Sequence, residues 1–276
     1  MWQIWRNNLQ KFSTEDYIYF EDMTVPGVHS YLHHVSPQAE ARERARQRLI
    51  VALDAPDGAS AMDIVDRLEG TCAWFKVGLE LFVAAGPGVL EPLLERGHEI
   101  FLDLKLHDIP NTVAGAVRSA ASLGVKLLTV HAAGGPAMLT AAREALAGVA
   151  HPPELLAVTV LTSMDDVQLK AVGVDREPGQ QVELLARTGL EAGIRGFVCS
   201  PLEVATLRQM TGPDGVLVTP GIRPADGAAG DQKRIATPAE ALRQGASYLV
   251  VGRPITQSAE PAKAAEGILE EMAAAV

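Results

Sequence analysis

The sequence predicts a (β/α)8 barrel, built as one domain over residues 48–276. Short apolar runs of strand length alternate, from residue 48 onward, with helical stretches rich in Ala, Leu and Glu. The runs carry apolar residues on both faces, which is typical of parallel strands buried on both sides. Eight such units in about 230 residues fit a closed barrel. The length of 276 residues suits one domain of this class.

The predicted strands are residues 49–53, 73–77, 100–104, 127–130, 155–161, 196–199, 216–218 and 248–251. The alternative architecture is an open doubly wound sheet, which normally carries a glycine-rich phosphate loop after its first strand. The segment after the first predicted strand reads DAPDGASA and lacks the GxGxxG pattern. We therefore favour the barrel.

Residues 1–47 are predicted to be an extension outside the barrel. They hold seven of the 13 aromatic residues (3 Trp, 4 Tyr and 6 Phe in all) without a clean helical or strand period. A charged, helix-prone run over residues 38–48 follows. The composition leaves three explanations open: a disordered tail, a segment docked on the barrel, or an early start codon. His29, His33 and His34 lie here without carboxylate or Cys neighbours, so we expect no metal site.

Composition narrows the class of partner. The formal net charge is −10 and no basic stripe is visible, which argues against nucleic-acid binding. No run approaches the ~20 apolar residues of a membrane span, and the N-terminus lacks the features of a secretory signal. Cys72 and Cys199 are too few for a disulfide framework. We expect a cytoplasmic protein, and an anionic small-molecule substrate stays open because a site depends on local charge.

Polar residues gather at the predicted strand ends, where barrels carry their functional groups. The strongest segment is FLDLKLHDIPNT, residues 101–112. Strand alternation puts Asp103 and Lys105 on one face, and burying them is costly unless they pair. A structural ion pair would explain two charges alone. Asp108 at the rim and Lys76 at an earlier strand end extend the set to alternating signs, which suits a protonated lysine beside a forming carbanion.

Two later segments indicate phosphate binding. VTPGIRP (218–224) and VVGRPIT (250–256) both end a late strand with Gly and Arg. Barrels often bind phosphate after strands seven and eight, where glycine lets backbone N–H groups approach and arginine grips the oxyanion. Residues 225–238 between them are rich in Gly and Ala and are typical of a lid, with Gln232 near its far end. The alternative is ordinary turn chemistry with surface arginines and a surface loop.

Three other strand ends carry weaker signals. Asp54 suits ribose hydroxyls, although DAPDG is also typical of a helix cap or an Asx turn. Thr162 and Ser163 suit the polar edge of a base. A lone His131 fits a structural hydrogen bond as well as it fits catalysis.

Taken together, these segments resemble the orotidine 5'-monophosphate decarboxylases, in their compact bacterial form. DLKLHDIPNT resembles the signature of that family. Six further blocks resemble others of the family in the same order: ALD (52–54), KVGLELF (76–82), AVTVLTS (157–163), TPGIRP (219–224), GDQKRIATP (230–238) and VVGRPITQS (250–258). The resemblance covers residues 48–272, and residues 1–47 have no counterpart in it.

The resemblance implies decarboxylation of orotidine 5'-monophosphate to UMP in de novo pyrimidine synthesis, without a cofactor or a metal. Lys105 corresponds to the lysine that protonates C6 of the product carbanion. Asp103 corresponds to the carboxylate that lies against the substrate carboxylate. Lys76 and Asp108 complete the charge network.

The resemblance also implies a homodimer in which Asp108, Ile109 and Thr112 reach into the partner's site. It assigns Asp54 to the ribose and Thr162 with Ser163 to the pyrimidine. The full set of substrate-binding candidates is Asp54, Lys76, Asp103, Ile109, Thr112, Thr162, Ser163, Pro220, Arg223, Gln232, Gly252 and Arg253. Of these, the resemblance assigns four to the phosphate: Arg223, Gln232, Gly252 and Arg253.

Two other functions stay open at this point. A sibling barrel family shares the D-x-K-x-x-D core but uses a divalent metal on sugar phosphates, as a decarboxylase or an aldolase. It needs a further acidic ligand near the second strand, and Glu80 lies four residues past Lys76. The DIPNT and GDQKRIATP blocks argue against that sibling. A non-enzymatic nucleotide-binding barrel is the other alternative.

Overall fold

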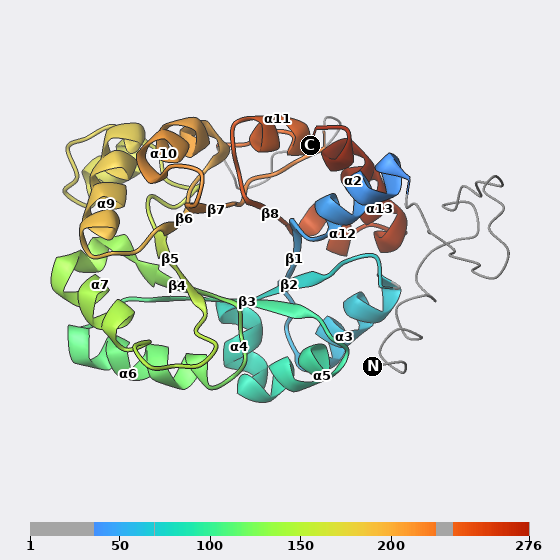
Figure 1. Cartoon of the computed structure of the whole chain (residues 1–276), viewed down its shortest axis with the longest axis horizontal. Coiled ribbons are helices and arrows are strands. Elements are labelled where there is room, and N and C mark those ends of the chain that lie inside the picture. The colour runs from blue at the N-terminus through green and yellow to red at the C-terminus, as the bar shows by residue number, and fades with distance from the viewer. Residues whose placement is uncertain (1–35, 69, 225–233, 276) are drawn as a thin grey trace, which may run out of the picture.

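The computed structural model describes residues 36–275, except residue 69 and residues 225–233, as a closed barrel (Figure 1). Its strands pair in parallel and in chain order, and the last pairs with the first. They are β1 (Leu49–Leu53), β2 (Trp74–Gly78), β3 (Glu99–Leu106), β4 (Leu127–His131), β5 (Glu154–Val158), β6 (Gly196–Val198), β7 (Val216–Thr219) and β8 (Tyr248–Val251). The predicted barrel is confirmed, and the open sheet is wrong.

Helices surround the barrel as an outer ring (Figure 1). They are α3 (Gly58–Arg67), α4 (Leu79–Ala85), α5 (Glu91–Glu95), α6 (Pro110–Ala121), α7 (Gly135–Glu144), α8 (Asp166–Ala171), α9 (Pro178–Glu191), α10 (Val204–Thr211), α11 (Pro238–Arg243), α12 (Arg253–Thr256) and α13 (Pro261–Ala273), with short 3-10 turns η3 (Pro87–Leu90), η4 (Ala132–Gly134) and η5 (Pro201–Glu203). Proline begins several of them, because the first turn of a helix has no use for its missing N–H. None of the described helices has both the length and the apolar character that crossing a bilayer requires.

The core has two layers, which explains why the strands are apolar on both faces. In β1, Ile50 and Ala52 belong to a cluster inside the barrel with Phe101 and Leu156. Their neighbours Leu49, Val51 and Leu53 belong to the larger layer between the strands and the helices. All five β1 residues are buried. This double burial is the physical basis of the sequence pattern.

The predicted strand bounds are close to the observed ones, with one clear exception. The strand predicted over residues 155–161 ends at Val158. The carbonyls of Val160 and Leu161 accept hydrogen bonds from the Arg234 guanidinium, each at 3.1 Å. In a continued strand, these carbonyls would accept from backbone N–H groups of the neighbouring strand. A long-range side chain therefore ends the pairing that the local apolar run predicts.

The end of the N-terminal extension is helical. Helix α2 (Pro37–Arg46) begins at Ser36, whose side chain accepts a hydrogen bond from the Ala39 N–H. It lies against α13, where Arg42 forms an ion pair with Glu266, and Ala45 is buried in the core. The helix-prone run is thus confirmed as a helix docked on the barrel. His29, His33 and His34 lie outside the described residues, and the domain boundary at residue 47 stays a prediction.

Two glycines in helix interiors give a matched test of the packing between the outer ring and the barrel. A Cβ at Gly189 in α9 would lie 2.7 Å from Cε1 of the buried Phe197, whereas a Cβ at Gly267 in α13 would meet nothing within 4 Å. Gly267→Ala should raise the free energy of unfolding by about 0.5–1 kcal/mol, because alanine loses less backbone entropy. Gly189→Ala should lower it by about 1–2 kcal/mol through overpacking. Urea denaturation measures both, and a gain at both positions would contradict this packing of α9.

Candidate active site

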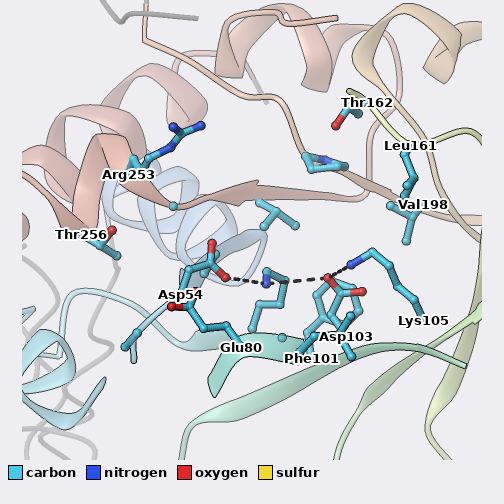
Figure 2. Close-up of a pocket in the computed structure, with 18 of the residues that line it drawn as sticks. Asp54, Glu80, Phe101, Asp103, Lys105, Leu161, Thr162, Val198, Arg253 and Thr256 are labelled. Carbon is cyan, nitrogen blue, oxygen red and sulfur yellow. Dashed lines mark hydrogen bonds and ion pairs between the residues drawn. The ribbon is translucent and has the colours of Figure 1, made fainter. Parts of the chain in front are cut away.

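A cavity of about 810 Å³ opens at the carboxyl ends of the strands (Figure 2). Its size is within the ~300–1,000 Å³ usual for small-molecule sites. The predicted site residues that line it are Asp54, Lys76, Asp103, Lys105, Thr162, Pro220, Arg223, Gly252 and Arg253. They come from strands and loops along the whole chain. The barrel therefore brings together most of the polar strand ends that the sequence singles out.

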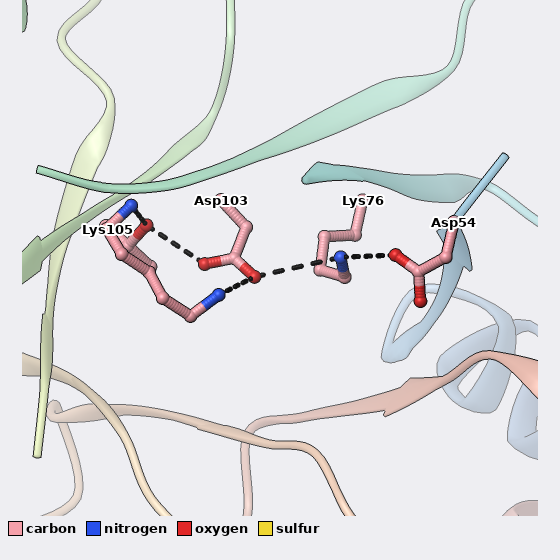
Figure 3. A network of polar contacts seen from close by, with 5 residues as sticks. Asp54, Lys76, Asp103 and Lys105 are labelled. Atoms are coloured by element: carbon pink, nitrogen blue, oxygen red, sulfur yellow. Dashed lines mark hydrogen bonds and ion pairs between the residues drawn. The ribbon is translucent and has the colours of Figure 1, made fainter. Parts of the chain in front are cut away.

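Four charged side chains form a line across the floor of this cavity (Figure 3). The Asp54 Oδ1 atom lies 3.1 Å from Lys76 Nζ, and Lys76 Nζ lies 3.7 Å from Asp103 Oδ2. Lys105 Nζ donates to the same Asp103 oxygen at 2.7 Å. The side chains of Lys76 and Asp103 are only 12% and 10% exposed, so each needs an opposite charge to offset its desolvation. The predicted alternation of sign is present.

Asp108 does not join this line within one chain, and its place in the charge network stays a prediction because the resemblance assigns it to the partner's site. Asp54 takes the outer position instead, because β1 is the neighbour of β2 and puts its carboxylate beside Lys76. Asp108 is exposed, and its Oδ1 accepts from the Ile109 N–H at 2.6 Å. Ile109, at 67% exposure, and Thr112 are also exposed and lie outside the cavity.

Lys105 reaches its position through an irregularity in β3. Its φ angle is +50°, and among the described residues Lys105 is the one non-glycine residue with a positive φ. Leu102 stands opposite Leu128, whereas Leu106 stands opposite Val130, so the register with β4 shifts between them. Bulges of this kind re-aim side chains next to active sites. The sequence argument from strand alternation correctly pairs Asp103 with Lys105, but the strand is not regular there.

Gly78 leaves the space that the Lys76 ammonium occupies. A Cβ at Gly78 would lie 2.7 Å from Lys76 Nζ and 3.7 Å from Asp54 Oδ1. Gly252 similarly lies close to β1, since a Cβ there would be 3.6 Å from Asp54 Oδ2. Both glycines thus allow the backbone to approach the charged line closely.

Two arginines that follow late strands also line the cavity. Arg253 begins α12 directly after β8, and Figure 2 shows it across the cavity from Lys105. Arg223 follows β7 and is buried, with its guanidinium donating to the Ile222 carbonyl at 2.8 Å. The Arg223 N–H also bonds the Ala236 carbonyl at 3.0 Å, which joins the two ends of the segment that carries the predicted lid. Gln232 lies outside the described residues.

Two further predicted residues lie near the site in different ways. Thr162 lines the cavity in a turn after β5, whereas the neighbouring Ser163 is exposed and does not line it. His131 ends β4 and stacks near His107, with ring centroids 5.3 Å apart. Burial lowers the pKa of His131, and electrostatic interactions with His107 and Lys105 lower it further. The Asp103 carboxylate acts in the opposite direction and raises this pKa, but by less. A neutral His131 is favoured at neutral pH, so Lys105 is the cation beside it.

A buried ion pair beside the cavity has no counterpart in the sequence analysis. Arg234 Nη1 lies 2.6 Å from Glu203 Oε1, and the Ser200 hydroxyl donates to the other Glu203 oxygen at 2.5 Å. The second Arg234 nitrogen holds the Val160 and Leu161 carbonyls, just before Thr162. The partners are 31 and 74 residues apart. The GDQKRIATP block contains Arg234, but nothing local points to its partners.

Cys199 also lines the cavity without having been predicted to do so. Burial raises the pKa of its thiol to about 12, as it does for Cys72. Both thiols are free and protonated at neutral pH. Both are buried in the core, so neither is expected to act as a nucleophile.

The closed barrel, the charged line at its mouth and the arginines across the cavity define a (β/α)8 enzyme with a site for an anionic small molecule. The family follows from comparison with known proteins. A sequence profile of the "Orotidine 5'-phosphate decarboxylase / HUMPS family" matches residues 47–268, and the chain belongs to this family. The resemblance drawn from the sequence blocks is confirmed.

Similar proteins match most of the chain. Orotidine 5'-phosphate decarboxylase of Moorella thermoacetica is 52% identical over 241 residues, 85% of this chain and 96% of that protein. The protein of the same name from Nitrosospira multiformis is 55% identical over 218 residues, 78% and 89% of the two chains. The crystal structure of orotidine 5'-phosphate decarboxylase from Lactobacillus acidophilus has a TM-score of 0.71 at 42% identity, covering 82% of this chain and 98% of that chain. The sugar-phosphate alternative gains no support from these proteins.

The Glu203–Arg234 pair should contribute strongly to stability. Both side chains are at most 10% exposed, so Glu203→Gln leaves an arginine buried without its counter-charge. We expect the free energy of unfolding to fall by about 3 kcal/mol, measured by urea denaturation. Glu99→Gln is the matched control, because Glu99 and Lys126 are 3.9 Å apart and 40% and 52% exposed. That control should change stability by less than ~0.5 kcal/mol. Similar small losses in both variants would contradict the role given to the buried pair.

Proposed function

We propose that this protein decarboxylates orotidine 5'-monophosphate to UMP, the reaction for which its relatives are named. The observation that carries the proposal is the line of Asp54, Lys76, Asp103 and Lys105 on the floor of the cavity. It presents an ammonium, held at 2.7 Å by a buried carboxylate, to whatever occupies the cavity. Such a group can stabilise negative charge that develops on carbon.

The nucleotide would span the cavity from the arginines to Lys105. Its phosphate would bind Arg253 and Arg223, together with the backbone at Gly252 and Pro220, and with Gln232. Figure 2 supports this direction, because Arg253 and Lys105 lie on opposite sides of the cavity that it draws. Asp54, 56% exposed, is available to accept hydrogen bonds from the ribose hydroxyls.

The pyrimidine would then lie at the inner end of the cavity. Thr162 lines the cavity near Leu161 and supplies a hydroxyl for the polar edge of the base. Ser163 is exposed in the same turn, directly after Thr162, and would join this contact. The substrate carboxylate would lie against Asp103, beside the Lys105 ammonium.

The chemistry proceeds in two events at C6. The bond between C6 and the carboxylate carbon breaks, CO2 leaves, and the electron pair stays on C6. The Lys105 ammonium then gives a proton to C6 and forms UMP, after which the neutral amine regains a proton from water. Lys105 stabilises the developing charge before it transfers the proton, which is catalysis by preorganised electrostatics.

Asp103 and Lys76 would make this possible by positioning. Asp103 Oδ2 holds Lys105, and Lys76 sits 3.7 Å from the same oxygen. The carboxylate therefore keeps a cation on either side and does not have to move during the reaction. Binding of the distant phosphate supplies energy that is used at the reacting carbon.

We further propose a homodimer with shared sites and a cytoplasmic location. Asp108, Ile109 and Thr112 follow β3 closely but do not line the cavity described above, and the apolar Ile109 is 67% exposed. Contact with the partner's site would give these residues a function. The two buried free thiols fit a reducing compartment.

The test is the loss of absorbance as purified protein converts orotidine 5'-monophosphate to UMP, with EDTA present. Rapid turnover in EDTA supports both the substrate and a reaction independent of a divalent metal. A folded protein that binds UMP but gives no turnover would overturn the proposal. Turnover of sugar phosphates that appears only with Mg²⁺ would point to the sibling reaction.

Lys105→Ala should lower kcat more than about a thousandfold, because the variant lacks both the positive charge at C6 and the proton donor. UMP binding should persist, since the phosphate contacts lie across the cavity. The measurements are turnover and UMP affinity by calorimetry. Lys126→Ala is a suitable control, because Lys126 is exposed and does not line the cavity. Substantial turnover by Lys105→Ala would remove Lys105 as the donor.

Mixing two inactive variants tests the shared site. Lys105→Ala and Asp108→Ala homodimers should each be inactive, because each lacks a group at both sites. A mixed dimer has one intact site, with Lys105 from one subunit and Asp108 from the other. After random exchange of subunits, about a quarter of wild-type turnover should return. Absence of recovery, with exchange verified by mass spectrometry, would place Asp108 in the chemistry of its own subunit. An active Asp108→Ala homodimer would place it outside the chemistry.

A further inference from the structure

The Thr129 hydroxyl links the backbone of Lys105 to the carboxylate of Asp103. The Lys105 N–H donates to Thr129 Oγ1 at 2.8 Å, and the Thr129 hydroxyl donates to Asp103 Oδ1 at 3.0 Å. Thr129 lies in the middle of β4 and is 0% exposed. It does not line the cavity, so it acts on a bound molecule only through its neighbours.

The register of the barrel explains why a side chain makes these bonds. Leu102 pairs with Leu128 and Leu106 with Val130, so the β3 residues between them face Thr129 alone. A regular parallel ladder cannot satisfy every backbone group of a bulged strand. The Thr129 hydroxyl accepts the Lys105 N–H at the point where the strand has φ +50°. A buried N–H without an acceptor is costly, so this bond stabilises the bulge.

The direction of the two hydrogen bonds also gives the two Asp103 oxygens different partners. Because Thr129 accepts from the backbone, its single proton is directed at Asp103 Oδ1. The other oxygen, Oδ2, receives the Lys105 ammonium and lies nearest Lys76. These contacts hold the Asp103 carboxylate in one orientation about its Cβ–Cγ bond. Without the hydroxyl, either oxygen could turn toward the ammonium groups.

We propose that Thr129 is a positioning residue, which orients Asp103 and Lys105 by bonding the side chain of one and the backbone of the other. The proposal rests on the proposed function for its kinetic consequences, because the chemistry belongs to Lys105. The hydroxyl is the active feature. The methyl group only fills space between the strands.

Thr129→Val and Thr129→Ser separate these two features. Valine keeps the shape and removes the hydroxyl, so kcat should fall about a hundredfold, the scale of a misplaced catalytic group. UMP affinity should stay within about threefold, because the phosphate contacts are not affected. Serine keeps both hydrogen bonds and should stay within about threefold of wild type in kcat, at some cost in stability. Steady-state kinetics and calorimetry provide the values.

Thr211→Val controls for the loss of any buried hydroxyl. Thr211 is 1% exposed in α10, and its hydroxyl donates to the Leu207 carbonyl at 2.9 Å, away from the cavity. It should lose stability without losing kcat. A Thr129→Val enzyme with kcat within threefold of wild type would overturn the proposal. Equal losses in the valine and serine variants at position 129 would also overturn it, because the methyl packing would then be responsible.

A crystal structure of Thr129→Val tests the positioning without reference to turnover. We expect the Asp103 carboxylate to rotate and the Lys105 ammonium to leave Oδ2. Unchanged positions of both groups would overturn the inference even if turnover fell. Failure of the wild-type protein to turn over orotidine 5'-monophosphate would contradict the proposed function instead, and the crystal structure would still decide the role of Thr129.

Discussion

A buried carboxylate shared by two ammonium groups is the interaction on which this site depends. Asp103 has a 10% exposed side chain, and Lys76 and Lys105 both approach its Oδ2 atom. A carboxylate at this depth without counter-charges would be strongly unfavourable. Two cations on one carboxylate leave a net positive centre, and Asp54 offsets part of it from the rim at 3.1 Å from Lys76. The balance leaves Lys105 as the cation directed at an anionic substrate.

The barrel makes this arrangement possible because its apolar strands form a rigid frame, while the charged side chains lie at the cavity. Its strands are apolar on both faces and hold their register through two layers of core. The charged groups of the site come from β2, β3 and the residue after β1, and they offset one another's desolvation where they line the cavity. The cavity gathers groups from the beginning and the end of the chain, since β8 closes against β1 and brings Gly252 near Asp54. Residues that are far apart in the sequence therefore meet where neighbouring strands pair.

A second buried ion pair holds the segment after β5 beside the cavity. Arg234 follows the segment of residues 225–233 and pairs with Glu203, while it also holds the Val160 and Leu161 carbonyls before Thr162. The turn that carries Thr162 is therefore tied to this guanidinium, and displacement of Arg234 would affect the proposed pyrimidine contact. The planar fork of arginine suits it to three acceptors at once.

The sequence by itself determined the barrel, its strands and the residue types at the cavity, because these depend on short-range periodicity and on motifs within a few positions. Asp103 and Lys105 are two residues apart, so strand alternation was enough to pair them. The tertiary structure alone decided the Asp54–Lys76 contact, the Glu203–Arg234 pair and the bulge at Lys105 with its bond to Thr129. Partners 22 to 31 residues apart meet only through the pairing of neighbouring strands and loops. A register shift is a property of two strands together, and neither strand's own sequence contains it.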